Sequence, residues 1–227
     1  MWRRQGYLSG RPEEVWRELI AKYVPGKTFV DVGCMWKVDG AYSFHALRSG
    51  ASAVTGIDMM EPTPGFCRQN TETGDTVGFF RGNLNDPAIE SWAGSYDVVF
   101  CAGVLYHVPN PVYSLLQLRK LCNETLILTS ASTMDHKIQN VGIFLPRLDD
   151  QSRTAQNFQG PHGGKKVGLD RDVDENLGFV PWFWLLTPSA IRSMVEAVGF
   201  EVKEFFKHRR VTTLVATRSG EPVVPPL

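Results

Sequence analysis

The chain has 227 residues, in which 24 lysines and arginines balance 24 aspartates and glutamates. This length is enough for one α/β domain with a large core, and it is short for two. A net charge of zero gives no overall field that would draw the protein to nucleic acid or to an anionic membrane, so those partners are disfavoured.

The N-terminal stretch and the cysteines favour a cytoplasmic protein. Residues 1–7 lack the apolar core of a signal peptide, and the longest apolar run, 178–186, is too short to span a bilayer. The four cysteines form no CxxC pair, which fits a reducing compartment better than a disulfide framework. We therefore expect a cytoplasmic location and no membrane segment.

The first predicted helix covers residues 12–23. Pro12 suits a first helical turn, apolar residues then recur at helical spacing, and Pro25-Gly26 ends the pattern. We interpret it as a helix that covers the core.

Residues 27–58 read as strand, glycine-bearing loop, helix and second strand. An apolar run leads into Gly33, a helical stretch covers 39–49, and the strand at 53–57 ends on Asp58. Gly33 lets the backbone approach a ligand closely, and the helix start presents unpaired amides. An acid at the end of the second strand is well placed to accept hydrogen bonds from a ribose. The unit predicts a site for an adenosine-containing cofactor at the carboxyl edge of the sheet.

The middle of the chain continues the alternation of strands and helices. Strands are expected at 76–80, 96–101 and 125–129, with short helices at 67–71 and 90–92. Asn110 and Pro111 form the cap and first turn of a further helix whose apolar residues face inward.

Residues 131–181 break this rhythm, since they are polar and without clear periodicity. Loops of this length in a compact domain are usually functional or disordered. Regularity returns with a helix that begins at Thr187-Pro188, followed by strands at 200–206 and 211–217. We expect a single domain, 1–220, and a disordered tail, 221–227.

Strands alternating with helices imply a doubly wound sheet. A final helix followed by a pair of strands is the ending of one particular class of doubly wound folds. With VDVGC at 30–34, GID at 56–58, GNL at 82–84 and DVVFCAGVLYHVPNP at 97–111, the chain resembles the class I S-adenosylmethionine-dependent methyltransferases. The resemblance implies an α/β, Rossmann-like, mostly parallel seven-stranded sheet with an antiparallel C-terminal strand and an insertion after the fifth strand. Within that class, 104–111 and 183–189 look most like the branch of tRNA wobble-uridine methyl and carboxymethyl transferases.

The resemblance implies a role around S-adenosyl-L-methionine for each matching position. The residues that would line this cofactor are Asp31, Gly33, Cys34, Met35, Trp36, Asp58, Met59, Asn83, Leu84, Cys101 and Ala102. Asp58 would hold the ribose hydroxyls, and Met59 would pack on the adenine. Asn83 would meet the adenine amino group with the Leu84 N–H nearby, since an amide still carries an acceptor oxygen. The carbonyls of the Cys101-Ala102 pair would face the cofactor's amine.

The loop after Gly33 departs from the family pattern. A second glycine usually stands about four positions after the first, whereas here 35–39 separate Cys34 from Gly40. The longer loop would either close over the cofactor, with Lys37 near its carboxylate and Trp36 on the substrate side, or deform the pocket. We favour closure, because the acid at the end of the second strand retains its form.

Two histidines are candidate general bases. His107 lies just beyond the fourth strand. A free imidazole has a pKa close to neutral pH, which suits a general base. The alternative role of His107 is to shape the turn before Pro109. Tyr106 is expected to line the acceptor pocket. In the loop after the fifth strand, His136 is a second candidate base and Asp135 an acceptor-binding residue, with a solvent-facing loop as the alternative.

Two further stretches carry residue types that bind ligands in other proteins. Trp182 belongs either to the core or to an aromatic lid over the acceptor. The acidic run 170–175 opens with the spacing of a calcium loop, but Glu175 stands where glycine is required and no closing acid follows. We expect no metal site.

The favoured function is methyl transfer to an oxygen or nitrogen of a small-molecule acceptor, such as a natural-product or sugar-like intermediate. A tRNA or other RNA methyltransferase is the first alternative, opposed by zero net charge and the lack of a basic stripe. The second is a non-catalytic protein that binds an adenosine cofactor, suggested by the unusual loop. The sequence leaves the oligomeric state open.

Overall fold

The computed structural model describes residues 5–7, 11–133, 137–144, 184–208 and 210–223. Three of the predicted site residues, Asp135, His136 and Trp182, lie outside these residues, as does the acidic run 170–175.

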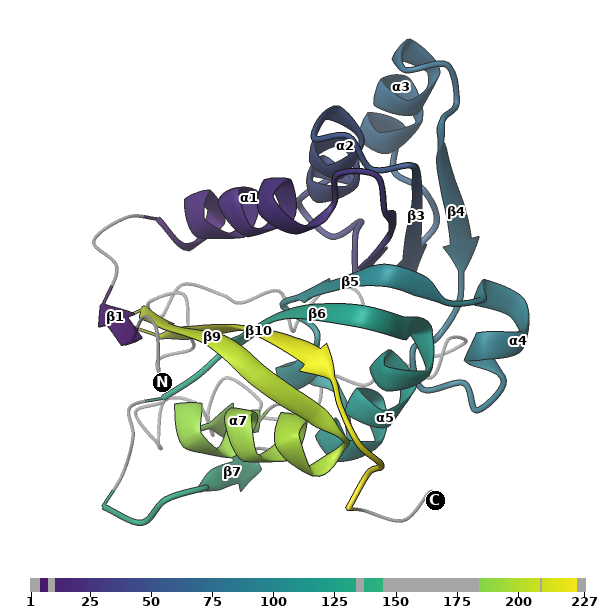
Figure 1. The fold of residues 1–227 in the computed structure, drawn as a ribbon. Coiled ribbons are helices and arrows are strands. Elements are labelled where there is room, and N and C mark those ends of the chain that lie inside the picture. Colours follow the sequence, from purple (N-terminus) through teal and green to yellow (C-terminus); the bar gives the residue numbers. More distant parts are fainter. Residues whose placement is uncertain (1–4, 8–10, 134–136, 145–183, 209, 224–227) are drawn as a thin grey trace, which may run out of the picture.

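The centre of the molecule is one eight-stranded sheet (Figure 1). Its strands are β1 (Gln5–Tyr7), β2 (Thr28–Val32), β3 (Ala53–Asp58), β4 (Val77–Arg81), β5 (Tyr96–Ala102), β6 (Cys122–Ala131), β9 (Phe200–His208) and β10 (Val211–Arg218). The spatial order is β1-β9-β10-β6-β5-β2-β3-β4. From β6 to β4 the pairs are parallel, whereas β10 is antiparallel to both of its neighbours.

The predicted fold class is confirmed: a mostly parallel sheet with an antiparallel strand at the C-terminal side. The three-residue strand β1, which the sequence did not predict, adds an eighth strand beside β9. Its partner lies about two hundred residues away in the chain, so no local pattern could reveal the pairing.

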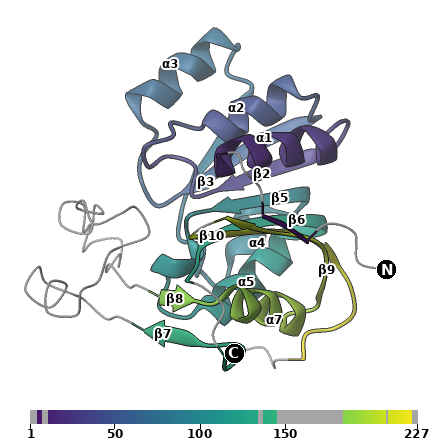
Figure 2. The same ribbon diagram turned by 90° about the vertical axis from the view of Figure 1, so that its left-hand side faces the viewer.

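Helices cover both faces of the sheet (Figures 1 and 2). On one face lie α1 (Pro12–Tyr23), α2 (Ala41–Arg48) and α3 (Pro64–Glu72); on the other lie α4 (Ile89–Ala93), α5 (Pro111–Leu121) and α7 (Pro188–Ala197). The predicted starts of α5 and α7 are confirmed, with Asn110 and Thr187 accepting hydrogen bonds from amides of the first turn. Helix α3 begins earlier than predicted, because Thr63 caps it and Pro64 occupies its first turn.

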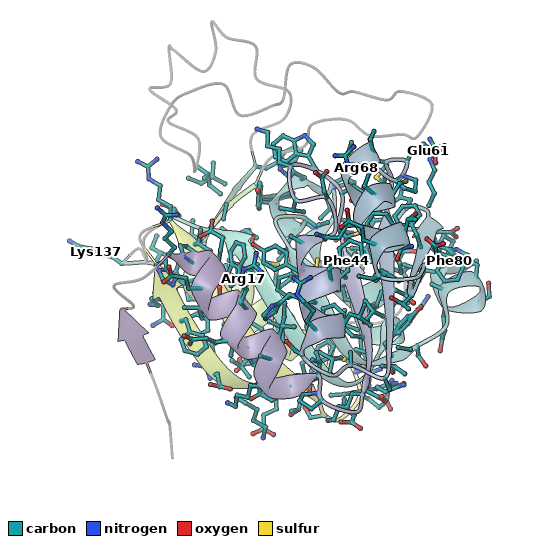
Figure 3. All side chains as sticks on the ribbon, turned by 90° about the horizontal axis from the view of Figure 1, so that it is seen from above. Arg17, Phe44, Glu61, Arg68, Phe80 and Lys137 are labelled. Carbon is teal, nitrogen blue, oxygen red and sulfur yellow. The ribbon has the colours of Figure 1, made fainter. Side chains whose placement is uncertain are left out.

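The core consists of two apolar layers separated by the sheet. Strand β5 contributes to both, since Val99 and Cys101 face the layer under α5 and α7, while Val98 and Phe100 face the layer under α1 and α2. Figure 3 looks onto this second layer, with Phe44 of α2 among the helices and Phe80 of β4 at the outer margin. A strand that is apolar on both sides is what a central parallel strand requires.

One strand of the predicted insertion 131–181 pairs with a strand that follows the insertion. Strands β7 (Gly142–Phe144) and β8 (Trp184–Leu186) form a separate antiparallel pair. The indole Nε1 of Trp184 donates to the Val108 carbonyl at 3.0 Å, which fixes β8 beside the short helix η1 (Leu105–His107). In the described part of the chain, none of the helices has both the length and the apolar character needed to span a bilayer.

Candidate functional site

The carboxyl ends of β2 and β5 form the point where the sheet order reverses. Helix α2 follows β2 on one face and α5 follows β5 on the other, so the connections diverge at this edge, which is where open α/β sheets bind their ligands. Gly33 stands there with φ +83°, and its N–H donates to the Ile57 carbonyl at 2.8 Å. A Cβ at this position would lie 2.4 Å from Cγ2 of Val104, so only glycine lets the Val104 side chain pack this close to the backbone of the turn.

Asp58 ends β3 beside this turn, and its carboxylate is held by two backbone amides. Oδ2 accepts from the Met35 N–H at 2.8 Å, and Oδ1 accepts from the Met60 N–H at 2.9 Å. Burial raises the pKa of Asp58, while these amides act in the opposite direction. Each carboxylate oxygen can accept more than one hydrogen bond, so the group retains capacity for two hydroxyls.

Asp31 is more deeply buried, at 1 % exposure, and it contacts the first turn of α2. Its Oδ2 accepts from the Ser43 hydroxyl at 2.8 Å. The N-cap of α2 is Gly40, which has no side chain to cap the helix, so Asp31 reaches that turn from the sheet. Burial raises the pKa of Asp31 to about 7, the nearby Asp58 adds to the increase, and the Ser43 bond opposes it.

The loop 34–40 is folded against the molecule. The side chains of Cys34 and Met35 are fully buried, and burial raises the pKa of the Cys34 thiol. Trp36 is partly exposed, and Nζ of the exposed Lys37 lies 4.2 Å from the centroid of the Trp36 ring. The loop therefore brings the Met35 N–H, rather than its side chain, to the Asp58 carboxylate.

The connection after β4 lies at the same carboxyl edge of the sheet. Asn83 is exposed, and its Oδ1 accepts from the Asn85 N–H at 2.9 Å, while the side chain of Leu84 is buried. The Ser114 hydroxyl on α5 donates to Asn85 Oδ1 at 2.6 Å and so fixes this turn. Met59 is partly exposed near the end of β3, and its carbonyl accepts from Nε of Arg81 at 3.2 Å.

Four more of the predicted site residues lie where β5 ends and on η1. Ala102 is partly exposed, whereas Cys101 is fully buried, and burial raises the pKa of its thiol. On η1, the rings of Tyr106 and His107 lie 4.1 Å apart between centroids. Burial raises the pKa of Tyr106 to about 12, so its phenol stays neutral at physiological pH. Ala131 of β6 and Trp184 of β8 pack around Tyr106.

The structure thus gathers most of the predicted residues at one edge. Sequence reasoning missed Ser43, Asn85 and Ser114, which hold site residues in place. Only the spacing of Ser43 in the first turn of the helix after Gly33 could have hinted at its contact with Asp31. Among the residues that the structure describes, no group of three or more His, Cys, Asp or Glu side chains is placed to hold a metal ion.

Comparison with known proteins agrees with this geometry. Residues 30–125, which run from β2 through β5 and include Gly33, Asp58 and Asn83, match a family model described as a methyltransferase domain. The chain is 22 % identical to a magnesium protoporphyrin IX methyltransferase from Synechocystis, solved with bound SAH, with a TM-score of 0.58 and coverage of 91 % of this chain and 81 % of that one. A 1,6-didemethyltoxoflavin-N1-methyltransferase from Burkholderia thailandensis gives 13 % identity, a TM-score of 0.60 and coverage of 92 % and 80 %.

The chain has the α/β, Rossmann-like methyltransferase fold. A ubiquinone biosynthesis O-methyltransferase from Vibrio parahaemolyticus is 36 % identical over 88 residues, which is 38 % of this chain and 35 % of that protein. One from Hahella chejuensis is 40 % identical over 89 residues, 39 % and 35 % of the two chains. The chain thus spans about a third of the length of these curated relatives. In this methyltransferase fold, Gly33, Asp58 and Asn83 all stand at the carboxyl edge of the sheet.

Proposed function

We propose that the chain is a methyltransferase that uses S-adenosyl-L-methionine and methylates an oxygen or nitrogen of a small-molecule acceptor. One observation carries the proposal. Asp58 presents a partly buried carboxylate at the end of β3, beside the left-handed Gly33 turn, within the segment that matches the methyltransferase domain.

The groups at this edge fit the proposed cofactor. The Asp58 carboxylate retains acceptor capacity for both ribose hydroxyls, and Gly33 leaves room where any side chain would collide with Val104. The exposed Asn83 and the backbone of Leu84 offer polar groups to an adenine edge. When bound, S-adenosylmethionine supplies an electrophilic methyl group, so the protein needs only to position the acceptor and remove a proton.

His107 is the proposed general base. It lies one short turn beyond β5, partly buried, against the neutral phenol of Tyr106. There its imidazole would accept the proton of an acceptor hydroxyl or ammonium group. The apolar side chains around Tyr106 would exclude water from the acceptor.

The finer assignments also stay proposals. The wobble-uridine branch was suggested by residues 104–111 and 183–189, and the second of these segments lies partly outside the described residues. The relatives named for ubiquinone biosynthesis support a small-molecule acceptor, but the short match does not carry their acceptor over to this chain. The cytoplasmic location remains a prediction from sequence.

Calorimetric titration with S-adenosylhomocysteine tests the cofactor site. We expect saturable binding by the full chain, and a loss of about tenfold or more in affinity for Asp58→Ala, since a partly buried carboxylate with charge-assisted hydrogen bonds is removed. Because Asp58→Ala also releases the Met35 amide, Asp58→Asn serves as the conservative variant. Absence of any binding by the unchanged chain would end the proposal.

A screen of small phenols, amines and hydroxylated heterocycles with labelled cofactor tests the transfer. With an acceptor that turns over, His107→Gln should lower kcat by about 10²- to 10⁴-fold and leave cofactor affinity unchanged. Unchanged turnover by this variant would remove the general base from the mechanism. Binding of the cofactor with no transfer to any acceptor would favour the non-catalytic alternative.

A further inference from the structure

The loop 34–40 is longer than the usual loop of the family, and it lacks the glycine that usually stands about four positions after Gly33. Other contacts must therefore hold its conformation. Lys37 and Asp39 both adopt left-handed backbone, with φ +60° and +48°. Non-glycine residues pay a steric penalty there, and such strain persists only where surrounding contacts impose it. The contacts at the two ends of this loop therefore hold the left-handed backbone of these residues in place.

One end of the loop is attached to β3. The Met35 N–H donates to Asp58 Oδ2, and the Gly40 N–H donates to the Cys34 carbonyl at 2.8 Å, which closes the loop on itself. Any movement of the loop would thus displace a donor from the carboxylate proposed to hold the ribose.

The other end is attached to the start of α3. The Thr63 hydroxyl donates to Asp39 Oδ1 at 2.7 Å, and the same hydroxyl caps α3 by accepting from the Phe66 N–H at 3.1 Å. A Cβ on Gly65 would lie 2.4 Å from Asp39 Oδ2, so the carboxylate rests directly on the glycine in the first turn of the helix. Gly40 rests in the same way on the Phe66 ring, with 2.5 Å to a Cβ built at that position.

We infer that Asp39 is a positioning residue for the cofactor site, acting through the loop on Asp58. This inference rests on the proposed function. Both attachments of the loop reach a single connection, residues 58–66, so the loop and the connection form one unit at the carboxyl edge of the sheet. With Asp39 in place, the Asp58 carboxylate is held in one orientation before the cofactor arrives, and binding does not have to order it.

Asp39→Gly is the principal test. Glycine adopts φ +48° without strain, so this variant removes the carboxylate and leaves the backbone conformation accessible. We expect its dissociation constant for S-adenosylhomocysteine to rise roughly three- to tenfold, the effect of losing one partly exposed hydrogen bond and loosening the loop. Asp39→Asn retains an acceptor for Thr63 and tolerates left-handed backbone, so it should recover most of the affinity.

Asp75 provides a matched control at the opposite end of α3. It too has left-handed backbone, with φ +55°, and its carboxylate accepts from a threonine hydroxyl, that of Thr71, at 3.4 Å. It lies before β4, at the amino edge of the sheet. Asp75→Gly should therefore leave the dissociation constant unchanged, whatever it does to stability.

Gly65→Ala separates positioning from stability. Alanine suits the first turn of α3 better than glycine, which offsets the loss of the Asp39–Thr63 hydrogen bond, so the free energy of unfolding should change by less than about 1 kcal/mol. Its Cβ must displace the Asp39 carboxylate, so affinity for S-adenosylhomocysteine should fall as it does for Asp39→Gly. This variant also decides the question should Asp39→Gly fail to fold.

Wild-type affinity in Asp39→Gly and in Gly65→Ala, with binding by the unchanged chain intact, would overturn the inference and leave the proposed function standing. An equal loss in Asp75→Gly would also overturn it, because the effect would then belong to α3 in general. Absence of binding by the unchanged chain would instead remove the proposed function, and this inference with it.

Discussion

Asp31 and Asp58 lie on adjacent strands, and different partners hold their carboxyl groups. Asp58 is contacted by backbone amides and remains partly exposed, whereas Asp31 is buried against the Ser43 hydroxyl. The burial of Asp31 means that its protonated form persists to about pH 7 in the folded chain. One carboxylate is therefore available for a ligand, and the other belongs to the internal structure of the site.

Replacing Asp31 by asparagine should change how stability depends on pH. The folded wild type keeps the Asp31 proton up to about pH 7, while the unfolded chain releases it near the ordinary value of 3.8. Between these values the folded state binds more protons, so this group makes the free energy of unfolding fall as pH rises. Asp31→Asn should match the wild type near about pH 4 and exceed it above about pH 7, by an amount on the order of 4 kcal/mol at most.

Urea denaturation across that pH range measures this effect, and Asp97 supplies a control of opposite sign. Asp97 accepts hydrogen bonds from the N–H and hydroxyl of Thr28 at 2.9 and 2.8 Å, and these bonds lower its pKa. Asp97→Asn should therefore cost stability at neutral pH and progressively less as pH falls. Parallel pH profiles for Asp31→Asn and the wild type would contradict the prediction.

At the scale of the elements, local chemistry was sufficient wherever an element is specified by its own residues. The unit at 27–58 was predicted because an apolar strand, Gly33 and a terminal acid are contiguous in the chain. The starts of α5 and α7 were predicted because a capping side chain directly precedes a proline. The same signal at Thr63-Pro64 was overlooked, so α3 was predicted too short.

Other features depend on contacts between distant residues and could not be predicted. The conformation of 34–40 is set by its contacts with 58–66, and the orientation of Asp31 by a hydroxyl twelve residues away. The pair β7 and β8 joins segments about forty residues apart, and the first of them lies in the stretch 131–181, which has no periodicity. In each case the residues can be read from the sequence, but their role depends on a contact in the folded chain that no local pattern predicts.

Trp184 connects this outer strand pair to the proposed base. Its Nε1–H bond to the Val108 carbonyl holds β8 against the residue that follows His107. Trp184→Phe retains most of the apolar contact and loses the hydrogen bond, worth about 1 kcal/mol. With an acceptor in hand, we expect kcat to fall roughly two- to tenfold through misplacement of η1, with S-adenosylhomocysteine affinity unchanged.

Trp92→Phe is the matched control for this effect on turnover. The Trp92 indole likewise donates one hydrogen bond, to Asp86 at 3.0 Å, but on α4, away from η1. It should leave kcat at saturating cofactor unchanged. Equal effects of the two substitutions on kcat would show that β8 has no particular connection to His107.

On the scale of the whole molecule, the sheet order places the proposed cofactor edge at the middle of the sheet, between two apolar layers. Strand β5 lies between β2 and β6, and each of its faces enters a different apolar layer. Phe100 is central to one layer, with ring centroids 5.1, 6.3 and 6.5 Å from those of Tyr42, Phe29 and Trp16. The residues that end β2 and β5 are thus anchored by packing from both sides.

Phe100→Ala should therefore destabilise the whole chain rather than the site alone. Truncating a fully buried phenylalanine leaves a cavity among rings that cannot all move inward, and such changes cost about 3 to 5 kcal/mol. Phe80→Ala is the control, because Phe80 is 40 % exposed and contacts Trp92 at the margin of the sheet, so its loss should cost about 1 kcal/mol or less. Denaturant midpoints with unchanged m-values would measure both. A cost for Phe100→Ala no larger than that for Phe80→Ala would mean that the layer beneath α1 and α2 does not anchor β5.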